Sequence, residues 1–425
     1  MPDYRMPGYG AIYYLFRLIF SQVFAYNALI IFQFILAGIS VYYLALTARF
    51  IFESDVLFYV CFYLFLISTY SNYFDGWLLT ESLAGSLLIF SVWFFTKYFE
   101  TGKPVNLLFA GIIIGWTIFI RPVFMPVVFF LAIILVFARK EQFVAPKTSM
   151  LKGLLLLIPP FLIAEGIWII KNYEKHQKLI VVTSVSLAPN AKNFYEPSLF
   201  HFLHSWGGSA DFGDNSAPLF WFGFHNKGTP IPKDYQYKFP EYMYTSKFNM
   251  DSLVWLKNKI TALNDSSLSP EKRYVYQVMV RDKLEKYLQS EKDEHPFLYY
   301  VRSPIFHCLP RFLFASQLNI YVKRFQAPGK LGLFTQYFFT FFYYLMLALG
   351  FAGILILFYK GLRKNRLSLI IAIIPTYTVV IHALIIRVTS NRFLMPAWAF
   401  LVMSAAYALV VVFSKEKSPG NSAGA

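Results

Sequence analysis

Nine predominantly apolar runs dominate this sequence and restrict what it can fold into. A run of about 20 apolar residues is long enough to cross a lipid bilayer as a helix. The bilayer core offers no water to bond the backbone, so helices that satisfy their own hydrogen bonds are the expected spanning structure. The predicted fold class is therefore an α-helical polytopic membrane protein. The nine predicted spans lie at about 26–47, 55–74, 79–98, 105–120, 122–138, 151–170, 333–359, 367–387 and 394–413.

The composition supports this prediction and excludes other classes. Only 15% of residues are charged, against 57% that are hydrophobic, whereas a soluble domain carries about 25% charged residues. Disordered, collagen-like and disulfide-rich chains are excluded. No disulfide is predicted, because Cys61 lies inside an apolar run and Cys308 is far from it in sequence. The formal net charge of +16 is better explained by basic membrane loops than by nucleic acid. The predicted partner is a lipid bilayer, and no nucleic acid is expected.

Basic residues in short loops predict the orientation of the spans. The segments 139–152 and 360–366 are both rich in Lys and Arg, and such loops stay on the cytoplasmic side. Nine alternating crossings then place residues 1–25 and a large insert outside. We expect a bacterial inner (plasma) membrane, with the insert in the periplasmic or extracellular space. The predicted parts are an external segment with an interfacial helix (1–25), six spans (26–170), an external α+β insert (171–332), three spans (333–413) and a cytoplasmic tail (414–425).

Within the insert, three local signals predict secondary structure. Residues 178–187 are rich in Val, Ile and Thr and predict one or two strands. Ser269 followed by Pro270 predicts the start of a helix that continues to about Ser290. Alternating aromatic and basic residues over 295–325 predict a helix on the lipid interface. A plain solvated face is the alternative for this last segment.

Charged residues gather at the predicted outer ends of the spans, against the positive-inside pattern. Charges at such places are costly and commonly paired or functional. Arginine can bind phosphate oxygens through two hydrogen bonds, and a carboxylate can act as a general base or position a cation. Together they suit a site for a lipid-linked phosphate; interfacial anchors or local ion pairs are the alternative. The residues are Arg5, Asp75, Glu81, Arg121, Lys171, Arg387 and Arg392.

A second arrangement could suit a metal. His201 and His204 are spaced to share one helix face, and Asp211 and Asp214 follow in sequence. Zinc and calcium use nitrogen and oxygen ligands of this kind. A loop near the acceptor is the simpler interpretation, so we predict no metal site here. A divalent cation is left open as a cofactor.

Several short motifs, in order, resemble the GT-C fold glycosyltransferases, the superfamily of protein O-mannosyltransferases and lipid A aminoarabinose transferases. Arg5-Met-Pro-Gly-Tyr-Gly is similar to their Arg-x-Pro-Gly-Tyr-Pro segment, and Leu79-Thr80-Glu81-Ser82-Leu83 to Leu-Thr-Glu-Pro-Leu. The segment from Thr117 to Arg121-Pro122 resembles Thr-Arg-Pro, and Trp168-Ile-Ile-Lys171-Asn172-Tyr173 resembles Trp-x-x-Arg-Asn-Tyr. Arg392-Phe393 resembles the Arg-Tyr/Phe before a late span. The set covers most of the chain.

The resemblance implies an enzyme that moves a sugar from a polyprenyl-phosphate donor to an acceptor at the outer membrane face. It implies that Arg5, Arg121, Lys171 and Arg392 bind the donor phosphate and that Glu81 is an acid of the site. We add Tyr9 and Arg387 to the substrate-binding set, and Asp75 and Asp3 to the candidate catalytic carboxylates. The family's catalytic carboxylate lies in an external loop upstream of the Arg-x-Pro-Gly-Tyr motif. We therefore expect a segment before Met1 to be missing, with that residue in it.

The predicted function is therefore a membrane glycosyltransferase acting by single displacement with inversion, its acceptor a glycolipid, polysaccharide or protein. A polysaccharide polymerase or ligase is also polytopic, but would not reproduce this order of motifs. A transporter should carry broken helices or ionisable groups near the bilayer midplane, whereas the charges here lie at one rim. A non-catalytic, truncated membrane protein is the remaining alternative.

Overall fold

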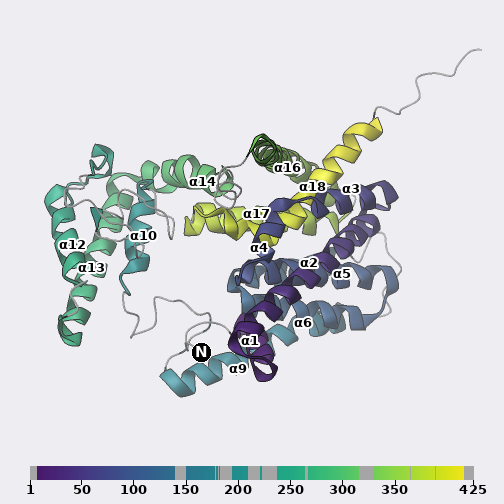
Figure 1. Ribbon diagram of the computed structural model, residues 1–425, viewed down its shortest axis with the longest axis horizontal. Helices are drawn as coiled ribbons and strands as arrows, with labels where there is room; N and C mark the ends of the chain where they lie inside the picture. Colours follow the sequence, from purple (N-terminus) through teal and green to yellow (C-terminus); the bar gives the residue numbers. More distant parts are fainter. Residues whose placement is uncertain are drawn as a thin grey trace, which may run out of the picture. The chain divides into compact units, whose positions relative to one another are not determined.

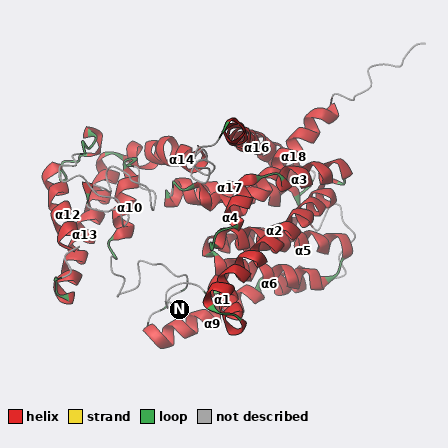
Figure 2. Ribbon diagram, viewed as in Figure 1, coloured by secondary structure: helices red, strands yellow, loops and turns green. Residues whose placement is uncertain are grey.

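The computed structural model describes residues 7–138, 150–177, 179, 181, 194–208, 221–222, 237–263, 267–314, 329–363, 365–387 and 389–415. Over these residues the chain is 87% helical and has no β-strand (Figure 2). Residues Thr245 and Phe248 form an isolated β-bridge. The strand predicted at 178–187 lies almost entirely outside the described residues.

The chain divides into two compact units. The first holds residues 1–183, 316–378 and 392–425, and the second holds 184–315 and 379–391. The second unit thus covers most of the predicted insert. It also takes the segment 379–387, which the apolar pattern assigned to the eighth span.

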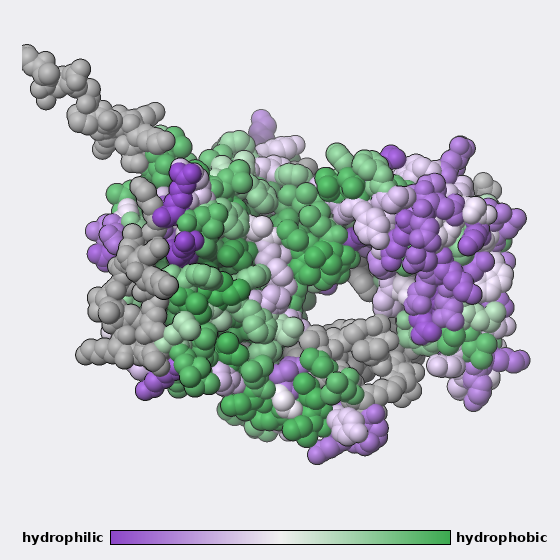
Figure 3. All heavy atoms as spheres, turned by 180° about the vertical axis from the view of Figure 1, so that it is seen from behind, coloured by the Kyte–Doolittle hydropathy of each residue, from purple (hydrophilic) through white to green (hydrophobic). Residues whose placement is uncertain are grey.

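The first unit contains most of the apolar helices, and α2, α5 and α6 run side by side within it (Figure 1). Its surface is largely hydrophobic, whereas hydrophilic residues cover much of the second unit (Figure 3). The helices in chain order are α1 (Gly8–Ile19), α2 (Gln22–Phe52), α3 (Asp55–Leu66), α4 (Thr69–Asp75), α5 (Thr80–Thr101), α6 (Pro104–Ile120), α7 (Met125–Ala138), α8 (Met150–Leu157), α9 (Pro159–His176), α16 (Lys330–Arg363), α17 (Ser368–Val379) and α18 (Met395–Lys415).

This is an α-helical polytopic membrane protein. Among the described residues, six helical segments are long and apolar enough to cross a membrane: Gln22–Phe52, Thr80–Thr101, Met150–Lys175, Lys330–Arg363, Ser368–Ile386 and Asn391–Phe413. The pair α3 and α4, bent by 53°, would make a seventh span. The helices Pro104–Ile120 and Pro122–Phe137 are apolar but shorter. Every predicted range is occupied by apolar helix, and the count of nine crossings stays a prediction.

Local sequence signals explain where several of these helices begin and end. Helix α5 ends at Gly102, which has φ +66°, a conformation that glycine adopts without strain. Helix α6 begins at Pro104, a favourable residue in a first turn. It ends at Arg121, which is extended because Pro122 disfavours a helical conformation in the residue before it.

Helices α16 and α18 pack closely because small residues lie between them. A Cβ atom added at Gly353 would overlap the backbone carbonyl of Ser404. One turn earlier, a Cβ atom at Gly350 would lie 2.6 Å from the side chain of Leu401. Small residues at such crossings let two membrane helices approach each other.

We expect Gly353→Ala to lower the free energy of unfolding by about 1–3 kcal/mol, because backbone would have to move to admit the methyl group. Denaturant unfolding in detergent micelles measures this change. Gly38→Ala in α2 is the matched control, since a Cβ atom there has nothing within 4 Å. Equal stability of the two variants would show that α16 and α18 are not packed through Gly353.

The second unit is a helical body around an aromatic core. Its elements are α10 (Glu196–Ser205), the 3-10 turn η3 (Glu241–Met243), α12 (Met250–Leu263), α13 (Pro270–Glu294), the π-helix η4 (Leu298–Cys308), α14 (Leu309–Phe314) and the π-helix η5 (Val380–Ile386). Phe202 and Tyr287 pack edge to face at 4.6 Å between ring centroids, and both are fully buried.

The predictions for the insert were right in part. The helix start at Ser269 is confirmed, because its side chain accepts a hydrogen bond from the Lys272 backbone at 3.4 Å. The described residues of the insert are helical, and the strand behind the predicted α+β character lies at 178–187, almost entirely outside them. The single helix predicted over 295–325 is instead a π-helix followed by α14, which ends at Phe314, and 315–325 lies outside the described residues.

Candidate active site

Glu81 is the centre of a buried charge cluster in the first unit. It lies in the first turn of α5, where a carboxylate is stabilised by the helix dipole. Its Oε1 atom accepts a hydrogen bond from Arg121 Nη1 at 2.8 Å and lies 3.7 Å from Arg392 Nε. The Thr80 hydroxyl donates to Oε2 at 3.3 Å. Two arginines that are far apart in the sequence therefore meet at one carboxylate.

Arg121 is the buried cation of this cluster. Its extended backbone before Pro122 ends α6 and lets the side chain reach the start of α5. Only 8% of the side chain is exposed. Besides Glu81, the guanidinium contacts Thr80 Oγ1 at 3.5 Å and lies 5.0 Å from the Phe393 ring centroid. Arg121 is thus already well bonded by the protein.

Arg392 is the accessible cation. It lies in a short 3-10 turn (Asn391–Leu394) just before α18, and 39% of its side chain is exposed. Its guanidinium lies 4.8 Å from the Phe393 ring centroid. Within the described part of the chain, its terminal nitrogens donate to no acceptor. A ligand can therefore use them. The cluster carries two positive charges against one negative charge, which leaves it a net cation.

Gln33 links Asp75 and Tyr9 through hydrogen bonds. Asp75 ends α4 and accepts a hydrogen bond from the Ser82 hydroxyl at 2.5 Å. Gln33 donates to the backbone carbonyls of Asp75 and Trp77 and accepts from the Tyr9 hydroxyl at 2.9 Å. Burial, together with the nearby Glu81 charge, raises the pKa of the Tyr9 phenol, so it remains a donor at neutral pH.

The remaining predicted residues are Asp3, Arg5, Lys171 and Arg387. Asp3 and Arg5 lie outside the described residues. Lys171 is exposed on α9, with its ammonium 5.4 Å from the Trp168 ring centroid, and in the described part of the chain it pairs with neither Glu81 nor Asp75. Arg387 belongs to the second unit.

Arg387 takes part in a separate buried cluster. Its Nη2 atom donates to the Tyr299 carbonyl at 2.6 Å, and its guanidinium lies 3.9 Å from the Tyr299 ring centroid. The Tyr299 hydroxyl pairs with His201 Nε2 at 3.0 Å. Glu291, which is fully buried, accepts a hydrogen bond from Ser205. Arg387 has φ +64°, a strained conformation for this residue.

No family model, curated protein or solved structure matches this chain. The assignment of the site therefore depends on its geometry. Among the described residues, no three His, Cys, Asp or Glu side chains come together as a metal site. His201 bonds Tyr299, and Asp211 and Asp214 lie outside the described residues.

Two polar residues of the site, Gln33 and Thr80, were not predicted as site residues from the sequence. Gln33 interrupts the apolar stretch 28–39 and could have been found as its one strongly polar side chain. Thr80 precedes Glu81 and bonds both partners of the ion pair. Threonine is common at the start of a helix because it can cap the backbone there, so its presence at this position did not indicate a site residue.

Proposed function

We propose that the protein is a membrane glycosyltransferase that takes its sugar from a polyprenyl-phosphate donor. The observation that carries the proposal is the Glu81–Arg121–Arg392 cluster. The three charges come from three predicted outer span ends: the start of α5, the end of α6 and the start of α18. The resemblance of the motifs that contain these residues to GT-C transferases supports the same function.

The chemistry of the cluster suits a leaving phosphate. As the acceptor oxygen attacks the anomeric carbon, the bond from that carbon to the phosphate oxygen breaks and the phosphate gains negative charge. Arg392 can stabilise this charge through its free terminal nitrogens. Arg121 adds a second positive charge behind it, and Glu81 keeps the two guanidinium groups together.

Asp75 is the better candidate for the general base among the described carboxylates. Glu81 is committed to two cations, which weakens it as a base. Asp75 accepts from Ser82 through Oδ1, and in the described part of the chain no donor reaches its Oδ2 atom. That oxygen can take the proton of an acceptor hydroxyl.

Replacing Arg392 with Gln should weaken binding of undecaprenyl phosphate about tenfold or more, since a hydrogen bond to a charged group contributes about 1.5–3 kcal/mol. Native mass spectrometry of the purified protein in micelles measures the affinity. Arg49→Gln is the matched control, because Arg49 pairs with Asp55 at an exposed position on the predicted inner side. Equal affinity in the Arg392 variant and the wild type would contradict the phosphate site.

A transporter is the second candidate, and the bent pair α3 and α4 favours it. Broken helices in membranes commonly surround transport sites, and this break was not predicted from the sequence. A transporter would move its cargo across vesicles and leave a lipid-linked sugar intact. A polymerase or ligase would show itself by a change in polysaccharide chain length.

A further inference from the structure

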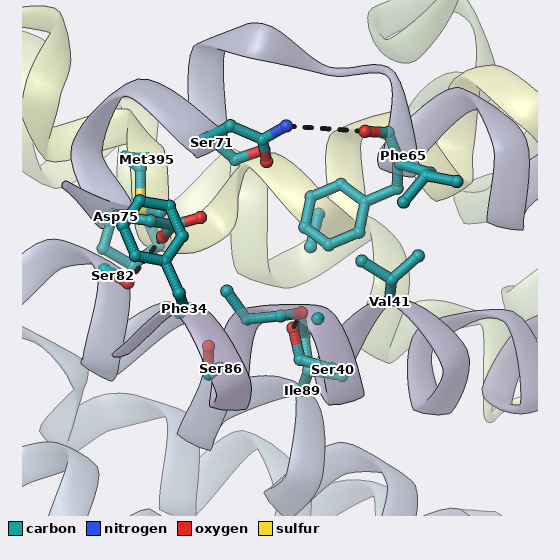
Figure 4. Close-up of a pocket in the computed structure, with 17 residues that line it drawn as sticks. Phe34, Ser40, Val41, Phe65, Ser71, Asp75, Ser82, Ser86, Ile89 and Met395 are labelled. Carbon is teal, nitrogen blue, oxygen red and sulfur yellow. Dashed lines mark hydrogen bonds between the residues drawn. The ribbon is translucent and has the colours of Figure 1, made fainter. Parts of the chain in front are cut away.

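A cavity of about 240 Å³ lies beside the charge cluster, within the first unit (Figure 4). Helices α2, α3, α4, α5 and α18 contribute its wall, and most of the lining is apolar. Six polar side chains also line it: Ser40, Ser71, Asn72, Asp75, Ser82 and Ser86. Apart from Asp75 and Asn72, these are serine hydroxyl groups.

The cavity presents mainly hydrogen-bond acceptors. Ser40 and Ser71 donate their protons to backbone carbonyls of their own segments, at 2.7 and 2.9 Å. Ser82 donates its proton to Asp75. Each of these hydroxyl oxygens keeps lone pairs that can only accept, and the carboxylate of Asp75 accepts as well.

Two lining groups can also donate: the Ser86 hydroxyl, which bonds no acceptor in the described part of the chain, and the Asn72 amide, which reaches the Leu66 carbonyl at 3.5 Å. A ligand that fits must therefore supply several O–H donors and can accept from these two groups.

An anionic group does not fit such a lining, because a carboxylate and lone pairs would repel it. A purely apolar chain would leave the acceptors without partners, which is costly away from water. A neutral polyol meets both conditions. The volume lies below the range of about 300–1,000 Å³ typical of pockets for drug-sized ligands, so one sugar ring is a better match than an oligosaccharide.

The break between α3 and α4 supports a polar occupant. Non-helical backbone at membrane depth is tolerated where it is covered by protein or borders a polar cavity. Leu66 and Ser71, on either side of the break, both line this cavity. The Trp398 indole donates to the Ser68 hydroxyl at 2.7 Å and fixes the break from α18.

The cavity and the charge cluster share two helix starts. On α5, Glu81 binds the arginines while the next residue, Ser82, lines the cavity. On α18, Met395 and Pro396 line the cavity just after Arg392. We propose that the cavity holds the sugar ring of the lipid-linked donor, with the serine oxygens accepting hydrogen bonds from its hydroxyl groups. This inference rests on the proposed function, which supplies the phosphate site beside it.

The test compares bare undecaprenyl phosphate with undecaprenyl phosphate linked to mannose, glucose or galactose. At least one sugar-linked lipid should bind wild-type protein more tightly than the bare lipid. Ser86→Val on α5 and Ser40→Val on α2 should each reduce that gain about three- to tenfold, because each fills space or removes an acceptor. Both variants should bind bare undecaprenyl phosphate like wild type, which also shows that they are folded.

Ser91→Ala is the matched control, since Ser91 is a buried serine of α5 that bonds the Ala110 carbonyl instead of lining the cavity. The inference is overturned if no sugar-linked lipid gains affinity over the bare lipid, or if the gain survives both cavity variants. In either case the phosphate site stands as long as the bare lipid binds. Failure of wild type to bind any of the four lipids would overturn the proposed function itself.

Discussion

Replacing Glu81 with Gln should lower the free energy of unfolding by about 3–5 kcal/mol, because it leaves Arg121 buried without a counter-charge. The side chains of Arg121 and Glu81 are 8% and 4% exposed, so water cannot replace the lost partner. Gln keeps the size of Glu, and the effect therefore reports charge more than packing. Denaturant unfolding of the purified protein in detergent micelles measures it.

A double-mutant cycle separates the ion pair from other effects. Arg121→Gln alone should also destabilise the protein, and the double variant should lose much less than the sum of the two single losses. Asp55→Asn is the control, since it breaks an ion pair with Arg49 whose side chains are 57% and 70% exposed. That variant should lose at most about 1 kcal/mol. Additive losses at Glu81 and Arg121 would contradict the buried pair.

The second prediction with a large effect is that ionisation of Glu291 makes the free energy of unfolding depend on pH. Burial raises the pKa of this carboxyl group to about 7, against smaller opposing effects of the Ser205 hydrogen bond and the Arg387 charge. In the unfolded chain the pKa returns to about 4.5. The protonated group therefore stabilises the fold fully below pH 4.5, and this contribution is lost as pH rises through 7. A difference of about 2.5 pKa units corresponds to about 3 kcal/mol.

Between pH 5 and 8, wild type should thus lose about 2.5 kcal/mol more stability than Glu291→Gln, which cannot ionise. The control is Glu294→Gln on the same helix, whose carboxyl group is exposed and has a lowered pKa, so it does not titrate in this window. Burial lowers the pKa of His201 to about 4, which gives the opposite slope below pH 6.5, but equally in all three proteins. If the free energy of unfolding changed with pH in the same way for wild type and Glu291→Gln, this account would be contradicted.

Much of the helical architecture could be predicted from the sequence, because an apolar run in a bilayer has few alternatives to a helix. The run predicted at 26–47 is part of α2, and the run predicted at 151–170 is occupied by α8 and α9. The break between α3 and α4 was not predicted. Trp398 bonds Ser68 at this break from 330 positions away in the sequence, and a local pattern carries no information on such a contact.

The candidate site could also be predicted only in part, because contacts between distant residues cannot be read from a local pattern. Charge at predicted span ends pointed to Glu81, Arg121 and Arg392, and the structure brings these three together. The same reasoning selected Arg387, only five residues before Arg392, yet its contacts are to Tyr299 in the second unit. The pattern gives the end of a span at which a charge lies, but not the helix that it faces. The cavity serines carried no signal either, since serine is common in membrane helices.

The central claim is that this chain transfers a sugar from a polyprenyl-phosphate donor. The most direct test supplies membranes that contain the protein with undecaprenyl phosphate linked to radiolabelled sugars, and follows label into the acceptor fraction. The account predicts transfer with release of undecaprenyl phosphate, reduced about tenfold or more by Arg392→Gln and unchanged by Arg49→Gln. Intact donor in wild-type membranes, with no binding of undecaprenyl phosphate to the purified protein, would contradict it.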